Sequence, residues 1–155
     1  MIKDAIRFNY LFRGLDEQQI DQVSAMGEVA KFHGGDVMIR QFDRSNDLLI
    51  LVEGSAIIRA FSGETLAEVG IGSVLGEVSL IDEQPRSATV VSAGESTAIV
   101  LRGSKLQEAM KRDPVLRAVL VTNLARLLCH RLRAANIQLD SALASATKAD
   151  ATAGS

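Results

Sequence analysis

The chain begins with apolar residues spaced three to four positions apart, as on one face of a helix. Residues 2–13 predict a short amphipathic helix, and a second helix is expected to begin at Asp16, where Gln19 three positions later completes a capping box. From Val29 the pattern changes to short apolar runs separated by Gly, Asp and Asn. After Gly103 the helical spacing returns and continues toward the C-terminus.

The central apolar runs predict strands at residues 29–32, 37–40, 48–52, 56–61, 66–69, 88–92 and 97–101. Many short strands at this spacing are typical of a β-sandwich or a jelly roll. The sequence therefore predicts a mainly β fold with flanking α-helices: a jelly-roll β-barrel, short N-terminal helices and a long C-terminal helix.

Two helices are expected after the strands. Ser104 is predicted to cap a helix that runs to Asp113, and Pro114 suits the first turn of a helix that extends to about Leu139 or beyond. The long helix carries a heptad seam at Val121, Ala125, Leu128, Leu132, Ala135, Leu139 and Ala142. One face is expected to pack on the barrel, and the seam predicts a homodimer through this helix. A purely intramolecular core helix remains the alternative near its start.

These patterns define one domain and a tail. The domain is expected to span residues 1–143, and residues 144–155 are too small and polar to order themselves and predict a disordered tail. Within the domain, the expected parts are N-terminal helices at 1–28, the barrel at 29–102, which contains a glycine-rich site segment at 72–91, and C-terminal helices at 104–143.

Composition narrows the functional classes. The chain has 155 residues and a net charge of −2, so it has no global attraction to nucleic acid or to an anionic membrane. No apolar run approaches the ~20 residues that span a bilayer. The single cysteine, Cys129, excludes an internal disulfide and indicates a reducing, cytoplasmic setting; its leucine-rich surroundings favour a packed thiol over a reactive one.

Residues 72–91 carry the candidate chemistry. Glu77 and Arg86 stand nine positions apart among apolar residues, where charges need partners. A guanidinium offers a planar fork of donors to a phosphate, and a carboxylate suits a sugar hydroxyl. The backbone N–H groups after Gly76 would point at an anion. Together these features predict a pocket for a phosphorylated sugar.

The segment resembles the phosphate-binding cassette of cyclic-nucleotide-binding domains. Gly72-Ser73-Val74-Leu75-Gly76-Glu77-Val78-Ser79-Leu80 followed by Pro85-Arg86-Ser87-Ala88-Thr89-Val90 matches the family pattern in type and spacing. One departure is Phe42, where many relatives have Gly, so the turn there is expected to differ. The resemblance implies a jelly-roll domain whose Arg86 binds the cyclic phosphate and whose Glu77 binds the ribose 2′-hydroxyl. It assigns the other ligand contacts to Gly76, Val78, Ser79, Ser87 and Ala88.

The resemblance leaves the base site more open. Leu75 and Val69, with Val52, are expected to line it, and Arg131 and Leu132 reach the covering positions that some relatives place on the last helix. Arg131 or Arg133 would lie over the purine through a cation–π contact, or else each belongs to a solvated helix face. Ser87 is compatible with either base, and the bacterial character of the sequence favours cAMP over cGMP.

The predicted function is a cyclic-nucleotide sensor in which ligand closes the C-terminal helix over the base. No cofactor, catalytic residue or metal site is expected, because His33 and His130 are isolated and no CxxC or HxxxH motif occurs. Only about a dozen residues follow the long helix, so no DNA-binding domain is expected, and the downstream protein partner is unknown. The alternative is a non-enzymatic interaction protein on the same fold that binds another nucleotide or none.

Overall fold

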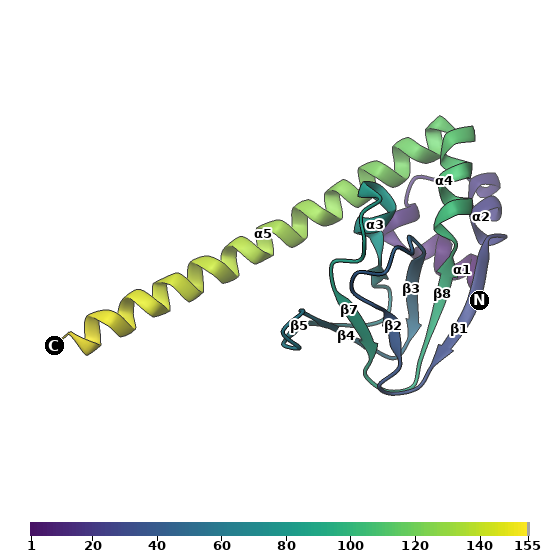
Figure 1. Cartoon of the computed structure of the whole chain (residues 1–155). Coiled ribbons are helices and arrows are strands. Elements are labelled where there is room, and N and C mark those ends of the chain that lie inside the picture. The colour runs from purple at the N-terminus through teal and green to yellow at the C-terminus, as the bar shows by residue number, and fades with distance from the viewer. Residues whose placement is uncertain (155) are drawn as a thin grey trace.

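Two four-stranded antiparallel sheets form the centre of the computed structural model, which describes residues 1–154 (Figure 1). One sheet has the order β1-β8-β3-β6 and the other the order β2-β7-β4-β5. The strands are β1 (Gly27–Phe32), β2 (Val37–Ile39), β3 (Leu48–Glu53), β4 (Ala56–Arg59), β5 (Thr65–Val69), β6 (Val74–Leu75), β7 (Thr89–Ser92) and β8 (Ser96–Leu101). The sheets do not close into a barrel but are arranged as in a jelly roll, and the predicted fold class is confirmed.

The helices flank these sheets. They are α1 (Ile2–Phe8), the 3-10 helix η1 (Tyr10–Phe12), α2 (Glu17–Ser24), α3 (Glu77–Asp82), α4 (Gly103–Arg112) and α5 (Pro114–Ala153). Among the described helices, none is both long enough and apolar enough to cross a bilayer.

Strand β3 separates two apolar cores. Its residues Leu48 and Ile50 pack into the larger core with the helices, whereas Leu49 and Leu51 face the smaller core between the sheets. Side chains alternate between the faces of a strand, so a strand covered on both faces must be apolar at every position. This explains the uninterrupted apolar run at residues 48–52.

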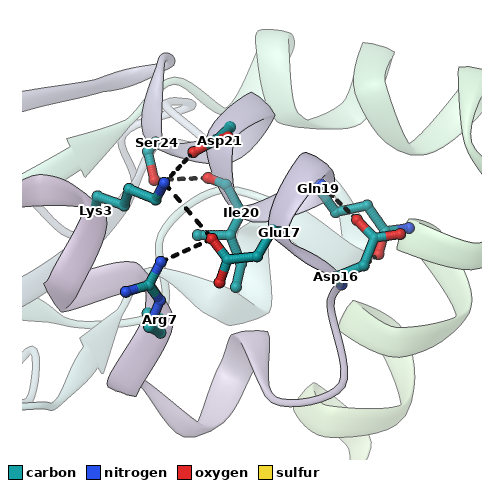
Figure 2. Close-up of polar contacts among 8 residues, drawn as sticks. All are labelled: Lys3, Arg7, Asp16, Glu17, Gln19, Ile20, Asp21 and Ser24. Carbon is teal, nitrogen blue, oxygen red and sulfur yellow. Dashed lines mark hydrogen bonds and ion pairs between the residues drawn. The ribbon is translucent and has the colours of Figure 1, made fainter.

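The N-terminal helices are fixed by polar contacts at their ends. The predicted capping box is confirmed: the Gln19 amide donates to the Asp16 carboxylate at 2.8 Å, and the Gln19 side chain accepts from the Asp16 amide at 3.0 Å (Figure 2). Lys3 pairs with Asp21 at 2.6 Å, and Arg7 pairs with Glu17 at 2.7 Å. These pairs join α1 to α2 and position the start of the chain against the larger core.

Several expected boundaries differ from the structure, and one strand was not predicted. The first predicted helix is divided at Asn9, whose side chain accepts a hydrogen bond from the Leu11 amide at 3.0 Å and begins η1. Helix α4 begins at Gly103 and not after a Ser104 cap, because the Gly103 amide donates to the Asp47 carboxylate. Strand β6 was missed, since two residues are too few to show a period.

Helix α5 begins as expected, with Pro114 in its first turn and with the Asp113 carboxylate accepting from the Val115 and Leu116 amides. It differs from the expectation at its far end: where a disordered tail was predicted, the helix continues through Ala153. Alanine has the highest helix propensity, and residues 144–153 contain five of them, which favours continuation of the backbone hydrogen bonds. Ser155, the last residue of the predicted tail, lies outside the described residues.

The 40 residues of α5 extend for about 60 Å, well past the sheets (Figure 1). Its buried residues lie only in its first turns, at Leu116, Leu120 and Leu124, which recur every four positions on one face. After Leu124 no residue of this helix is fully buried. The remainder runs above α3 and then away from the body of the domain.

Candidate functional site

The predicted cassette forms a compact turn where β6 leads into α3. Gly76 precedes α3 with φ +86°, a left-handed conformation that side chains rarely adopt. A Cβ at this position would lie 2.7 Å from the Asp47 carbonyl oxygen and would also collide with the Arg86 guanidinium. Glycine is therefore required by both the backbone conformation and the close approach of Arg86.

Arg86 is buried beneath this turn. Its Nη1 donates to the Gly76 carbonyl at 3.0 Å and its Nη2 donates to the Asp47 carbonyl at 2.6 Å. Burial lowers the pKa of the Arg86 guanidinium from its usual value, while the carboxylates of Asp47 and Asp43 act in the opposite direction. The group remains charged near neutral pH, since an arginine is effectively always protonated.

Hydrogen bonds also fix the backbone around Arg86. Its amide donates to the Asp43 carbonyl at 2.8 Å, and its carbonyl accepts from the Phe42 amide at 2.9 Å. Phe42 has φ +71°, a left-handed conformation that glycine adopts without strain, and its ring packs edge-on against Phe61 at 6.0 Å between centroids. The loop before β3 therefore holds the backbone of Arg86 in place through two hydrogen bonds.

Glu77 opens α3 and faces the same region. Only 6% of its side chain is exposed, and its Oε1 atom accepts from Nη1 of Arg131 on α5. The other terminal nitrogen of Arg131 donates to the Val74 carbonyl at 3.3 Å. A buried carboxylate needs such a partner, because an unpaired charge that has lost its water is costly. The Arg131 side chain itself is 41% exposed, so solvent weakens the attraction between the two charges.

These groups line one cavity of about 290 Å³. Its lining residues are Ile39, Ile58, Leu66, Leu75, Gly76, Glu77, Val78, Ser79, Arg86, Ser87, Ala88, Val90 and Arg131. The lining combines a guanidinium, a carboxylate and the start of a helix with aliphatic side chains. Such an arrangement can hold an anionic group, a neighbouring hydroxyl and a flat apolar group together.

The structure brings most of the predicted site residues to this cavity, but not all of them. Neither Val69 nor Val52 lines the cavity: Val69 packs against the smaller core, and Val52 packs against the larger one. Leu132 is 62% exposed on α5, beyond the lining. It follows Arg131 directly, and neighbouring helix residues point about 100° apart, so only one of the two can face the cassette.

The sequence did not predict the aliphatic residues that line the cavity, nor the hydrogen bond from Arg86 to the Asp47 carbonyl. Ile39, Ile58, Leu66 and Val90 come from four different strands, and each reads as an ordinary strand residue. Their alternation with outward-facing neighbours marks a buried face but does not distinguish a core from a cavity. The role of Asp47 could not be predicted, since a backbone carbonyl that binds a distant side chain leaves no pattern in the sequence.

The described residues contain no cluster of three or more His, Cys, Asp or Glu side chains that could hold a metal ion. Cys129 was expected to be packed, but it lies exposed on α5, because the turns after Leu124 have left the body of the domain.

The cavity geometry agrees with a match to a protein family. Residues 29–113, more than half of the chain, match the family model of the cyclic nucleotide-binding domain. The chain belongs to this family. The cassette and both sheets, apart from the first two residues of β1, fall within the matched residues, whereas α1, α2 and all of α5 lie outside them.

Two of the proteins similar to this cyclic nucleotide-binding domain are named for cyclic AMP. The cyclic AMP receptor protein of Thermus thermophilus is 31% identical over 134 residues, which cover 84% of this chain and 60% of that protein. The cAMP-dependent protein kinase regulatory subunit of Mycosarcoma maydis is 30% identical over 101 residues, which cover 63% of this chain and 19% of the kinase subunit. The chain thus spans less than two thirds of either relative.

A solved structure supports the fold across nearly the whole domain. A cyclic nucleotide-binding protein from Geobacter metallireducens superposes with a TM-score of 0.77, covering 85% of this chain and 98% of its own, at 23% identity. At that identity the likeness concerns the fold alone.

Proposed function

We propose that this domain binds a 3′,5′-cyclic nucleotide in the cavity at the start of α3. One observation carries the proposal: the buried guanidinium of Arg86 and the buried carboxylate of Glu77 face one cavity of about 290 Å³. That volume is near the lower end of ligand pockets, roughly 300–1,000 Å³. Arg86 binds the cyclic phosphate, together with the Ser87 hydroxyl and the Ala88 amide. Glu77 accepts a hydrogen bond from the ribose.

The other predicted contacts follow from this placement. Gly76, Val78 and Ser79 bring the backbone of the α3 turn close to the sugar, and Leu75 begins the apolar wall along which the base lies. cAMP is the favoured ligand, because the similar proteins of Thermus thermophilus and Mycosarcoma maydis are both named for it. Ser87 suits adenine and guanine ligands alike, so cGMP is the alternative ligand.

The protein acts as a sensor, as is usual for this family of regulatory, non-catalytic domains. Ligand stabilises the position of α5 in which this helix covers the cavity. A ligand shifts such an equilibrium only by its differential affinity for the two positions of the helix. The ion pair between Arg131 and Glu77 supports this role, since it gives α5 a direct contact with the proposed ribose site.

The projecting part of α5 is proposed to pair with a second copy of the chain. Leu132, Leu139 and Leu143 are all more than half exposed, and Leu132 and Leu139 belong to the predicted heptad seam. A helix with an exposed apolar stripe gains stability by burying it against a partner helix. A further downstream partner would bind this assembly.

Isothermal titration calorimetry with cAMP and with cGMP tests the proposed function. Saturable 1:1 binding per chain is expected, tighter for cAMP. Equal absence of heat for both nucleotides at several temperatures, with a folded protein, would refute the function and favour an interaction protein that uses this fold without cyclic nucleotide.

A further inference from the structure

Arg131 is the one residue of α5 whose side chain reaches the cassette through hydrogen bonds in the described structure. Its two terminal nitrogens bind different groups there, the Glu77 carboxylate and the Val74 carbonyl. We propose that Arg131 positions Glu77 for the ribose 2′-hydroxyl, so that discrimination between ribose and 2′-deoxyribose depends on the docking of α5. This inference rests on the proposed function.

The first argument comes from the burial of Glu77. Its side chain is 6% exposed, and the guanidinium of Arg131 is its only hydrogen-bonding side-chain partner within residues 1–154. A glutamate has three rotatable side-chain bonds, so a single partner at a fixed point selects its rotamer. Without Arg131, the carboxylate would turn toward whatever donor or water is nearest, and its orientation toward a ligand would be lost.

The second argument concerns the free acceptor capacity of Glu77. An ionised carboxylate offers about four lone-pair sites on two oxygens, and Arg131 donates to Oε1 alone. Glu77 lines the cavity, so a ligand hydroxyl can donate to the carboxylate while the ion pair stays intact. The two donors therefore act together on one carboxylate and do not exclude each other.

The third argument concerns the guanidinium itself. A cation–π contact requires the planar group to lie over the face of the base. The second hydrogen bond of Arg131, to Val74 on β6, instead holds the group against the wall between β6 and α3. The two terminal nitrogens of Arg131 donate to two different groups of the cassette at once. A lysine ammonium is a single point charge and cannot donate to both with the same geometry.

The consequence is a link between ligand chemistry and the position of the long helix. Arg131 lies two turns beyond Leu124, the last buried residue of α5. Any movement that lifts this part of the helix also removes the partner of Glu77. A domain with α5 displaced would still bind the phosphate through Arg86 but would no longer distinguish the two sugars.

Competition between cAMP and 2′-deoxy-cAMP measures this discrimination directly. The wild type should prefer cAMP by about 10-fold or more, the value expected for one charge-assisted hydrogen bond. Arg131→Gln should reduce the ratio of the two affinities to within about threefold of unity, as should Glu77→Gln. Adding Arg131→Gln to Glu77→Gln should change the ratio no further, because both act on the same bond. Arg133, the other arginine considered for the base, is exposed on the same helix and does not line the cavity, so Arg133→Gln is the matched control and should keep the wild-type ratio.

Two results would overturn the inference while leaving the proposed function intact. One is an unchanged ratio in Arg131→Gln, which would make the ion pair merely structural. The other is a raised ratio, which would mean that Arg131 competes with the ribose. If Arg131→Gln does not fold, Arg131→Lys decides, and a ratio equal to that of Arg133→Gln would contradict the forked anchoring. A wild type that binds neither nucleotide would instead refute the proposed function, and the inference with it.

Discussion

Arg86 and Asp47 are 39 positions apart, yet the Arg86 Nη2 atom donates to the Asp47 carbonyl at 2.6 Å. The Asp47 carboxylate in turn accepts a hydrogen bond from the Gly103 amide at 3.0 Å, where α4 begins. One loop residue thus connects the proposed phosphate-binding guanidinium to the first of the C-terminal helices. Arg86 is at once a ligand-binding group and part of the internal support of the cassette.

Replacing Arg86 by Leu should greatly weaken binding of cyclic nucleotide. A phosphate without its charged partner is expected to lose ~2–5 kcal/mol, roughly thirty-fold to several thousand-fold in affinity, measured by calorimetry. Arg44→Leu, at an exposed arginine of the neighbouring loop, is the control and should bind normally. Melting curves must accompany both variants, because Arg86 also supports the backbone. Binding of Arg86→Leu within a few-fold of wild type would argue against this phosphate site.

Gly76→Ala should destabilise the cassette and weaken nucleotide binding. The new methyl group would collide with the Asp47 carbonyl and the Arg86 guanidinium, and the backbone would hold alanine at a positive φ, a strain of about 1–3 kcal/mol by itself. Gly63→Ala is a matched control, since Gly63 has φ +88° but no atom within 4 Å of an added Cβ. Urea unfolding should show a clearly larger loss for Gly76→Ala. Equal losses in the two variants would mean that the close approach has no energetic effect.

Leu132→Glu and Leu139→Glu should each weaken self-association without unfolding the domain. Both residues are exposed on α5, where a charge in an apolar seam between two helices opposes pairing but leaves the buried anchors of the helix untouched. Light scattering over a range of concentrations measures the effect. Gln138→Glu adds the same charge beside the seam and should leave assembly unchanged. A wild type that is monomeric at high concentration, with and without nucleotide, would exclude the dimer.

The His33–Glu95 pair predicts a small pH dependence of stability. A hydrogen bond to the Glu95 carboxylate at 2.8 Å, followed by attraction to Glu95 and Asp36, raises the pKa of His33 above its ordinary value. A raised pKa in the folded state contributes stability below the unfolded value of about 6.5, and this contribution is lost as the pH rises through the folded value.

His33→Gln should therefore cost stability at a pH of about 5.5 and little at about 8.5. Both side chains are about 80% exposed, so the difference should be small and should shrink in about 1 M salt. Urea titrations of the two proteins at both pH values provide the measurement. A His33→Gln effect that is the same at both pH values would show that the pair has no linkage to folding.

Saturating nucleotide should slow amide exchange at residues 76–88 and also at residues 127–135 of α5. The second region is expected to respond because Arg131 connects it to Glu77 across 54 positions. The Arg86→Leu variant at the same nucleotide concentration controls for nonspecific effects. Protection confined to the cassette would mean that the domain binds nucleotide but does not transmit binding through this helix.

The sequence by itself determined the elements and the local chemistry of the cassette. Strand runs, the Asp16–Gln19 capping box and Pro114 at the start of α5 are short-range features, fixed by periodicity, backbone hydrogen bonding and ring geometry. The spacing of Glu77 and Arg86 within one turn-rich segment is equally local. Most residues of the cassette therefore reached the cavity where the sequence predicted them.

Only the tertiary structure decided what completes the site. Whether Arg131 or Leu132 faces the cassette depends on the rotation of α5, which the packing of Leu116, Leu120 and Leu124 against the larger core sets. The support of Arg86 by Asp47 depends on a loop that lies 39 residues away. One of these contacts depends on a backbone carbonyl and the other on the rotation of α5 about its axis. Neither produces a periodic pattern in the sequence. The shape of the cavity thus results from tertiary packing, although the sequence of the cassette already predicts two of its charged groups, Glu77 and Arg86.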